Sequence, residues 1–189
     1  AEIIKCGVIG YKKILNLLKH HRDKILNRNT NFLFKICYLT LKTKIKFFVN
    51  DIFEKDRRLS LNFGHTFAHA IEMAIEQKLK RDVIRHGEAV GLGMLCEIFY
   101  DKGKKEKIYK TIKDLLEKYN LPTFISLKNI PIGKVNLQDS IYRKIFLDKK
   151  KLDKYPRYIS ISNFYNTKPK EIKDFDHLNE TIDQIFKKK

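Results

Sequence analysis

The sequence is poor in cysteine and in the residues that interrupt secondary structure, and it contains no long apolar run. Its 189 residues include 8 Gly and 4 Pro, and its 3 cysteines are widely spaced, with no C-x-x-C pair. This pattern indicates neither a disulfide framework nor a thiolate zinc cluster, and it favours a reducing, cytoplasmic compartment. Lys interrupts the apolar runs well short of the roughly 20 residues that a membrane-spanning helix needs, so we expect no membrane partner.

The sequence also lacks the marks of a nucleotide-binding domain. No G-x-G-x-x-G or other Gly-rich phosphate turn follows a predicted strand, and no region alternates strands and helices in the βαβ manner. A dinucleotide site is therefore not expected within these residues. The first residue is Ala1 rather than Met, and residues 1–9 read as the middle of an amphipathic element. We expect the chain to begin inside a larger protein.

Positive charge dominates the composition, with 40 Lys plus Arg against 22 Asp plus Glu and a formal net charge of +18. One interpretation is a basic helical module that binds nucleic acid through its phosphates. However, 32 of the 40 basic residues are Lys, whereas recognition by forked hydrogen bonds should rely more on Arg. Nucleic acid is therefore the less favoured partner. With 43% hydrophobic residues, the chain can fill the core of a domain.

Apolar residues recur at steps of three and four along much of the chain, which is the helical period. We predict a mainly α, multi-helical fold with a small antiparallel β element near residues 157–163, where residues 158–162 alternate in the period of a strand. A polar break is expected at 20–30. The predicted helices cover residues 3–18 in one or two pieces, about 31–51, 57–80, 86–100, 104–119 and 178–189.

Histidines and carboxylates cluster in the middle of the chain, where His65, His69 and His86 lie near Glu72 and Glu88. On a helix, His65 and His69 share one face, and Glu72 follows three residues further on the same stripe. Imidazole and carboxylate ligands suit zinc, and a catalytic zinc takes three protein ligands. The same spacing also fits one buried, hydrogen-bonded histidine beside a solvated one, and spacing alone does not decide between these interpretations.

The residues around these histidines form a distinctive pair of motifs. They are LNFGHTFAHAIE at 61–72 and HGEAVGLGM at 86–94, and together they resemble the 3-dehydroquinate synthase family. The opening AEIIKCG at 1–7, the stretch 44–58 and DKK at 148–150 match the same family in the same order. The resemblance covers the C-terminal, metal-binding half of that enzyme and weakens after Lys150.

The resemblance implies a fold, partners and cofactors. Residues 1–189 would form a single C-terminal domain that binds metal and substrate, and an N-terminal NAD-binding α/β domain would be absent from this chain. The metal would be Zn²⁺ or Co²⁺, NAD would be bound mainly by the missing domain, and the intact enzyme would be a homodimer. We expect the isolated chain to bind zinc with weak or moderate affinity and to turn nothing over.

The resemblance also assigns roles to individual residues. The implied metal ligands are Glu2, His65 and His86. The implied substrate contacts are Lys5, Lys44, Arg58, Asn62 and one of Lys149 and Lys150. The implied proton acceptors are Glu54 and His69. This assignment differs from the one that spacing suggests, because it makes His69 a neighbour of the metal and takes the third ligand from distant Glu2.

The implied activity is that of a phosphorus–oxygen lyase of the shikimate pathway. It converts 3-deoxy-D-arabino-heptulosonate 7-phosphate, an anionic sugar acid, to 3-dehydroquinate and phosphate. Another sugar-phosphate cyclase with the same fold is the alternative. Taken singly, the residues also have structural interpretations: Glu54 and Arg58 could form an exposed helical ion pair, Asn62 could cap a turn, and each Lys could be solvated surface.

Two departures from the family pattern stand out. Ala68 occupies a position where the family usually has Gly, so it adds a methyl group near the proposed site, which would tighten packing or reduce the room for substrate. The segment 73–85 is about four residues longer than expected and lacks the usual Gly, so we expect a longer loop or helix end.

Overall fold

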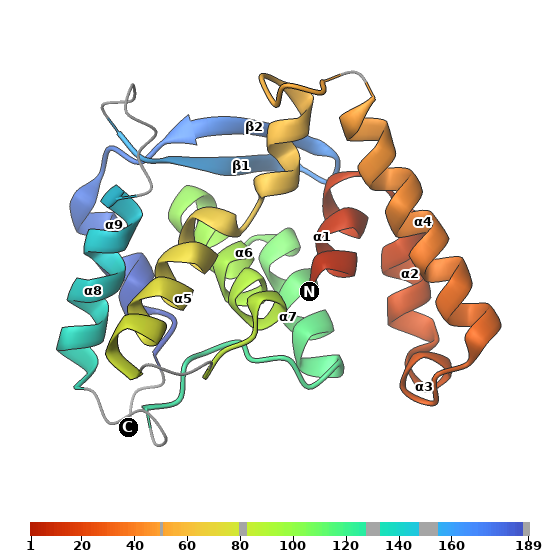
Figure 1. The fold of residues 1–189 in the computed structure, drawn as a ribbon, viewed down its shortest axis with the longest axis horizontal. Helices are drawn as coiled ribbons and strands as arrows, with labels where there is room; N and C mark the ends of the chain where they lie inside the picture. The colour runs from red at the N-terminus through yellow and green to blue at the C-terminus, as the bar shows by residue number, and fades with distance from the viewer. Residues whose placement is uncertain (50, 80–82, 128–132, 148–154, 187–189) are drawn as a thin grey trace.

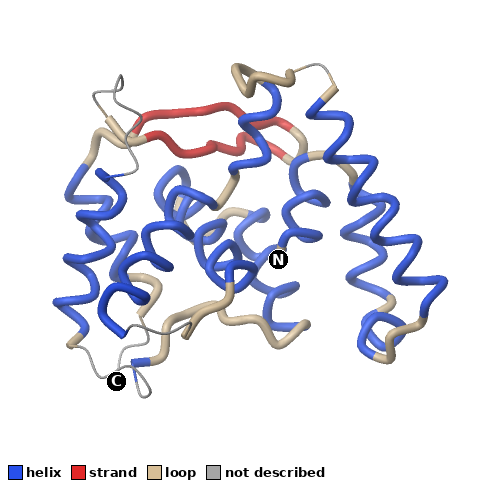
Figure 2. Tube along the Cα trace, in the orientation of Figure 1, coloured by secondary structure: helices blue, strands red, loops and turns tan. Residues whose placement is uncertain are grey.

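The computed structural model describes residues 1–49, 51–79, 83–127, 133–147 and 155–186. Most of these residues are helical, and one hairpin of two strands accompanies the helices (Figure 2). The elements are α1 (Glu2–Ile9), α2 (Lys12–His20), α3 (Arg22–Leu26), α4 (Thr30–Phe48), the 3₁₀ helix η1 (Arg57–Asn62), α5 (His65–Leu79), α6 (His86–Lys102), α7 (Lys107–Lys118), α8 (Lys134–Leu147), β1 (Arg157–Asn163), β2 (Asn166–Glu171) and α9 (Phe175–Asp183). The prediction of a mainly α fold with a small antiparallel β element is confirmed.

Helix α6 lies between two hydrophobic clusters and contributes to both. Its Val90 and Met94 belong to a cluster shared with α1, α2, α4 and α7, whereas Leu92 and Cys96 pack with α5, α8, α9 and β1. Figure 1 shows α2 and α4 on one side of this centre, α8 and α9 on the other, and the hairpin across one end. Because residues 89–98 of α6 are all buried, the helix has no exposed polar face there, and the one charged residue of that stretch, Glu97, is itself buried.

Helices α5 and α6 approach each other through two glycines. Gly64, which precedes α5, has a φ of +84°, a value that L side chains rarely adopt. A Cβ on Gly93 of α6 would collide with the carbonyl oxygen of Gly64 and lie 3.0 Å from the backbone nitrogen of Ala68. These contacts bring the start of α5 onto the middle of α6.

The hairpin is held to α6 through Asp101. This carboxylate accepts hydrogen bonds from Tyr158 (3.0 Å) and Ser160 (2.9 Å) of β1 and from Lys170 of β2 (2.6 Å). In the hairpin register, Tyr158 pairs with Lys170. One carboxylate therefore anchors both strands against the central helix.

The predicted helix over about 31–51 and the predicted polar break before it differ in detail from the structure. Helix α4 begins one residue before the predicted start because Asn29 caps it, accepting a hydrogen bond from the Phe32 backbone N–H (3.0 Å). It ends at Phe48 rather than near Asp51. The Asp51 carboxylate instead accepts hydrogen bonds from backbone N–H groups of the following loop and from that of Arg58 in η1 (3.0 Å). The polar break at 20–30 contains a short helix, α3, which buries none of its residues.

The single helix predicted over 57–80 is wrong in its first part. Residues 57–62 form the 3₁₀ helix η1, and the chain turns at Gly64 before α5 begins at His65. The positive φ of Gly64 interrupts helical geometry at this point. As a result, His65 becomes the first residue of an α-helix.

The C-terminal region adds one helix that the sequence analysis did not propose. Helix α8 buries Leu137, Ile141 and Ile145, which repeat every four residues and so carried a helical signal. Helix α9 starts at Phe175, earlier than predicted, because the Asp174 carboxylate caps it, and it ends at Asp183. The predicted last residues, 187–189, lie outside the described part of the chain.

Among the described residues, no helix has both the length and the apolar composition that crossing a bilayer requires.

We predict that Gly93→Ala lowers the free energy of unfolding by at least about 2 kcal/mol, because the new methyl group must push α5 away from α6. The matched control is Gly87→Ala, also on α6, where an added Cβ meets nothing within 4 Å. This control should keep or slightly raise stability. Urea unfolding followed by circular dichroism measures both, and equal midpoints for the two variants would contradict the packing argument.

Candidate metal centre

Three helices begin at the candidate site. Glu2 is the first residue of α1, His65 of α5 and His86 of α6. One ligand atom of each lies within 4.8 Å of the others, and together they form a group that could hold a metal ion. The structure therefore brings together the three residues that the family resemblance implied as ligands. The set that spacing suggested, His65 with His69 and Glu72, is not the group that converges among the described residues.

The donor set and its dimensions fit zinc. The Nε2 atom of His65 lies 3.8 Å from Oε1 of Glu2, and the ring centres of His65 and His86 are 5.4 Å apart. Ligand atoms around a tetrahedral zinc are separated by about 3.4 Å, so small side-chain movements would complete the arrangement. Two imidazoles and one carboxylate also leave a coordination position open, as catalytic zinc sites do.

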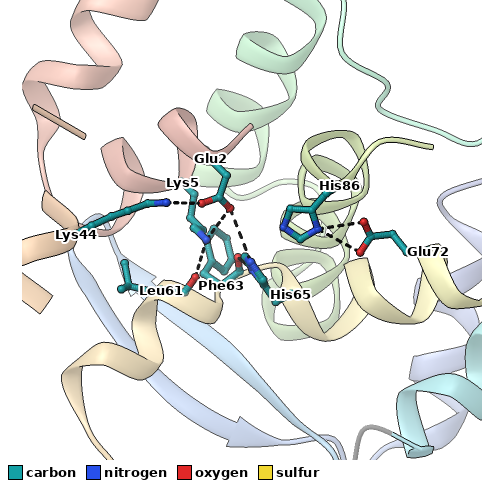
Figure 3. A network of polar contacts seen from close by, with 8 residues as sticks. All are labelled: Glu2, Lys5, Lys44, Leu61, Phe63, His65, Glu72 and His86. Carbon is teal, nitrogen blue, oxygen red and sulfur yellow. Dashed lines mark hydrogen bonds and ion pairs between the residues drawn. The ribbon is translucent and has the colours of Figure 1, made fainter. Parts of the chain in front are cut away.

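Two lysines neutralise Glu2 (Figure 3). Lys5 Nζ lies 2.7 Å from Oε1 and Lys44 Nζ lies 3.0 Å from Oε2, while Lys5 also donates to the Leu61 carbonyl at 2.6 Å. Burial opposes ionisation of Glu2, but the two ammonium groups outweigh it and lower its pKa to about 2. Glu2 is therefore a carboxylate at any physiological pH, which is the form that binds a cation.

His65 is held in its neutral form. Burial, with a further contribution from the charge of Lys5, lowers the pKa of His65 to about 4. Its Nδ1 lies 3.3 Å from the Phe63 carbonyl oxygen, so Nε2 is the nitrogen directed toward Glu2. A neutral imidazole with one nitrogen engaged by the backbone is ready to bind a metal through the other.

A cavity of about 280 Å³ adjoins His65. Its wall includes the two residues implied as proton acceptors, Glu54 and His69, and the implied substrate contact Asn62. His69 is one turn after His65 on α5, and their rings are 5.4 Å apart. Arg157 of β1 also lines this cavity. Arg157 carries no signal in the sequence, because no motif surrounds it and only the folding of the hairpin brings it here.

Of the other residues implied to contact substrate, Asn62 and Arg58 both lie beside Glu54. Asn62 donates a hydrogen bond from its amide nitrogen to Glu54, so it does more than cap a turn. Arg58 Nε lies 3.9 Å from Glu54, but its guanidinium also lies over the Phe48 ring at 4.5 Å. The alternative of an ordinary helical ion pair is wrong, because Glu54 has a φ of +55° and lies outside any helix. Lys149 and Lys150 lie outside the described residues.

The two departures from the family pattern lie on α5 and in the segment that follows it. Ala68 is fully buried in the hydrophobic core, so its methyl group contributes to packing. In the longer segment before His86, residues 80–82 lie outside the described part of the chain, and α5 continues to Leu79. His86 starts α6 all the same.

Comparison with known proteins decides the family. The family model described as "3-dehydroquinate synthase C-terminal" matches residues 1–151. The chain belongs to the 3-dehydroquinate synthase family. It is 35% identical to the 3-dehydroquinate synthase of Ruthia magnifica over 80% of this chain and 40% of that protein. It is 34% identical to the 3-dehydroquinate synthase of Prochlorococcus marinus strain MIT 9312 over 100% of this chain and 48% of that protein. The chain thus spans about half the length of the curated relatives it matches.

Solved structures share the fold. The 2-epi-5-epi-valiolone synthase of Streptomyces hygroscopicus, solved with NAD⁺ and Zn²⁺, matches 97% of this chain and 49% of its own with a TM-score of 0.73 at 14% identity. A 2-deoxy-scyllo-inosose synthase complexed with carbaglucose-6-phosphate, NAD⁺ and Co²⁺ matches 80% of this chain and 41% of its own with a TM-score of 0.57 at 26% identity. The resemblance to dehydroquinate synthases that the motifs indicated is thereby confirmed at the level of family and fold.

In this dehydroquinate synthase domain, a buried carboxyl group supports the turn that carries His65. Glu97 of α6 is 1% exposed and accepts a hydrogen bond from the backbone N–H of Ile159 in β1 (3.2 Å). Burial raises the pKa of Glu97 to about 8, although the backbone N–H groups of Gly64, Ile159 and Thr66 partly offset the shift. Glu97 therefore joins the start of α5 to the hairpin.

We predict that Glu97 makes wild-type stability fall as the pH rises. Between its unfolded value of 4.5 and about 8, the folded protein retains a proton on Glu97 that the unfolded chain has lost. Relative to Glu97→Gln, the wild-type free energy of unfolding should therefore decrease by up to about 1.4 kcal/mol per pH unit. Urea unfolding at about pH 5 and pH 7.5 tests this, with exposed Glu76→Gln as the control. Parallel pH profiles for wild type and Glu97→Gln would refute the prediction.

Proposed function

We propose that this chain is the C-terminal, metal- and substrate-binding part of a 3-dehydroquinate synthase, a phosphorus–oxygen lyase that converts 3-deoxy-D-arabino-heptulosonate 7-phosphate to 3-dehydroquinate and phosphate. The observation that carries this proposal is the convergence of Glu2, His65 and His86 from three separate helix starts. The family membership and the curated relatives support the same reaction.

The proposal includes a metal and a nucleotide cofactor. Glu2, His65 and His86 would hold Zn²⁺ or Co²⁺, the ions named for the two solved structures described above. When bound, such an ion polarises a substrate hydroxyl or carbonyl as a Lewis acid. NAD would bind mainly to an N-terminal α/β domain, which these residues do not contain.

The residues of this chain would bind and orient an anionic substrate. Lys5 and Lys44 place two positive charges beside the metal ligands, and Arg58 and Arg157 add guanidinium groups near the cavity. Lys and Arg bind carboxylates and phosphates, the Arg side chain with forked geometry. The charge of the site therefore matches a sugar acid that carries a phosphate.

Proton transfer would fall to two residues of the cavity wall. Glu54 accepts a hydrogen bond from Asn62, which orients its carboxylate, and His69 faces the same cavity one turn beyond His65. Oxidation of a ring hydroxyl acidifies the neighbouring C–H, so that a positioned base can remove the proton before phosphate leaves. Both side chains meet the first requirement of a general base, which is a place in the substrate cavity.

A second candidate is another sugar-phosphate cyclase. The observation in its favour is that the two solved structures described above are a valiolone synthase and an inosose synthase. The curated relatives, at 34 to 35% identity, favour dehydroquinate synthesis. Product analysis of the longer enzyme with each sugar phosphate distinguishes the two.

We predict that the chain binds zinc and that His65→Ala and His86→Ala each weaken binding by more than about 100-fold. The matched control is His20→Ala, because His20 is the exposed last residue of α2 and does not belong to the group of candidate ligands. Competition with a chromogenic chelator measures affinity. Unchanged zinc affinity in either site variant would contradict the ligand assignment.

We also predict that the isolated chain, given zinc, NAD and substrate, releases no phosphate. Joined to the NAD-binding half of a curated relative, it should form 3-dehydroquinate, and Glu54→Gln should lower kcat by about 100-fold while leaving zinc affinity intact. Phosphate release and product formation are the measurements. Turnover by the isolated chain would show that the NAD-binding half is not needed.

A further inference from the structure

Glu72 lies directly behind His86. Both of its carboxylate oxygens are within hydrogen-bond distance of His86 Nδ1, at 3.0 and 3.2 Å. Figure 3 shows the His86 ring between this carboxylate and the pair formed by Glu2 and His65. Glu72 comes from the second turn of α5, so the contact joins the helix that starts at His65 to the helix that starts at His86.

We propose that Glu72 is a positioning residue of the metal centre, which holds the His86 ring so that Nε2 faces Glu2 and His65; this rests on the metal site proposed above. A carboxylate only accepts hydrogen bonds, so the shared hydrogen must sit on His86 Nδ1. A neutral imidazole carries one hydrogen, which leaves Nε2 with a free lone pair. Carboxylates in this position orient metal-binding histidines and raise their basicity.

His86 needs such a partner more than His65 does. The side chain of His86 is 52% exposed, whereas that of His65 is 17% exposed and its Nδ1 faces the Phe63 carbonyl. The backbone at His86 is held by reciprocal hydrogen bonds between Arg85 and Glu88, at 2.9 and 2.8 Å. Those bonds place the start of α6 but not the ring, whose orientation Glu72 determines.

The competing role for Glu72 is that of a metal ligand, which its spacing from His65 and His69 first suggested. The structure favours positioning, because both Glu72 oxygens face Nδ1 and neither belongs to the group formed by Glu2, His65 and His86. The two roles predict different consequences of substitution. A lost ligand should weaken zinc binding as much as His86→Ala does, and a lost positioning residue should weaken it less.

The test compares Glu72→Ala, Glu72→Gln and the control Glu76→Ala, which removes an exposed carboxylate one turn further along α5. The first readout is the ¹⁵N imidazole spectrum of the metal-free chain. In wild type we expect His86 as the Nδ1–H tautomer. The same tautomer is expected in Glu72→Gln, because the amide oxygen still accepts a hydrogen bond from Nδ1–H. In Glu72→Ala the population should shift toward the Nε2–H tautomer. If Glu72 only stabilised the fold, its substitution would not change the tautomer of His86.

The second readout is zinc affinity by chelator competition. Glu72→Ala should weaken it by about 10- to 100-fold, Glu72→Gln by less, and Glu76→Ala by no more than about twofold. Circular dichroism of each variant confirms that the helices are retained.

Three results would overturn the inference: an Nε2–H tautomer in wild type, zinc affinity of Glu72→Ala within about twofold of wild type, or a loss equal to that of His86→Ala. If wild type bound no zinc but its tautomer still depended on Glu72, the proposed metal site would fail and the orienting role of Glu72 would be supported. The two proposals therefore fail separately.

Discussion

The contact between Gly93 and Gly64 is the constraint on which the site depends. A side chain at position 93 would collide with the backbone at Gly64, and Gly64 itself has a left-handed conformation against Met94. Because α5 begins one residue after Gly64, the approach of these backbones determines where His65 stands relative to α6. The buried carboxyl of Glu97 holds the same turn by accepting hydrogen bonds from the backbone N–H groups of Gly64 and Thr66.

The charges around Glu2 and His65 set the protonation states of these two candidate metal ligands. Lys5 and Lys44 keep this carboxylate ionised, and burial together with Lys5 keeps His65 neutral. Both groups are thus in the forms that bind a cation, although positive charge surrounds them.

The sequence predicts the helical fold well where the signal is local. Gly103 ends α6 near the expected place, and the period-two segment before Asn163 forms a strand. The helix expected from residue 57 starts later, because the turn at Gly64 depends on packing against α6. At the site, only the resemblance to the family motif predicts Glu2 as the third metal ligand, because helical spacing relates residues a few positions apart and Glu2 is distant in sequence from His65 and His86. The contribution of Arg157 and the contact of Glu72 with His86 arise from tertiary packing, which no single segment encodes.

The position of each candidate ligand at a helix start has a consequence for dynamics. The first turn of a helix is prone to hydrogen exchange because its amides have no intrahelical acceptor, although at α5 the Glu97 carboxyl accepts the Thr66 backbone N–H. Opening one turn at Glu2, His65 or His86 would remove a donor and release the ion. Conversely, a bound ion would slow local opening at all three helix starts together, although they lie far apart in sequence. If the site holds a metal ion as proposed, metal occupancy and the local order of α1, α5 and α6 would be one coupled equilibrium.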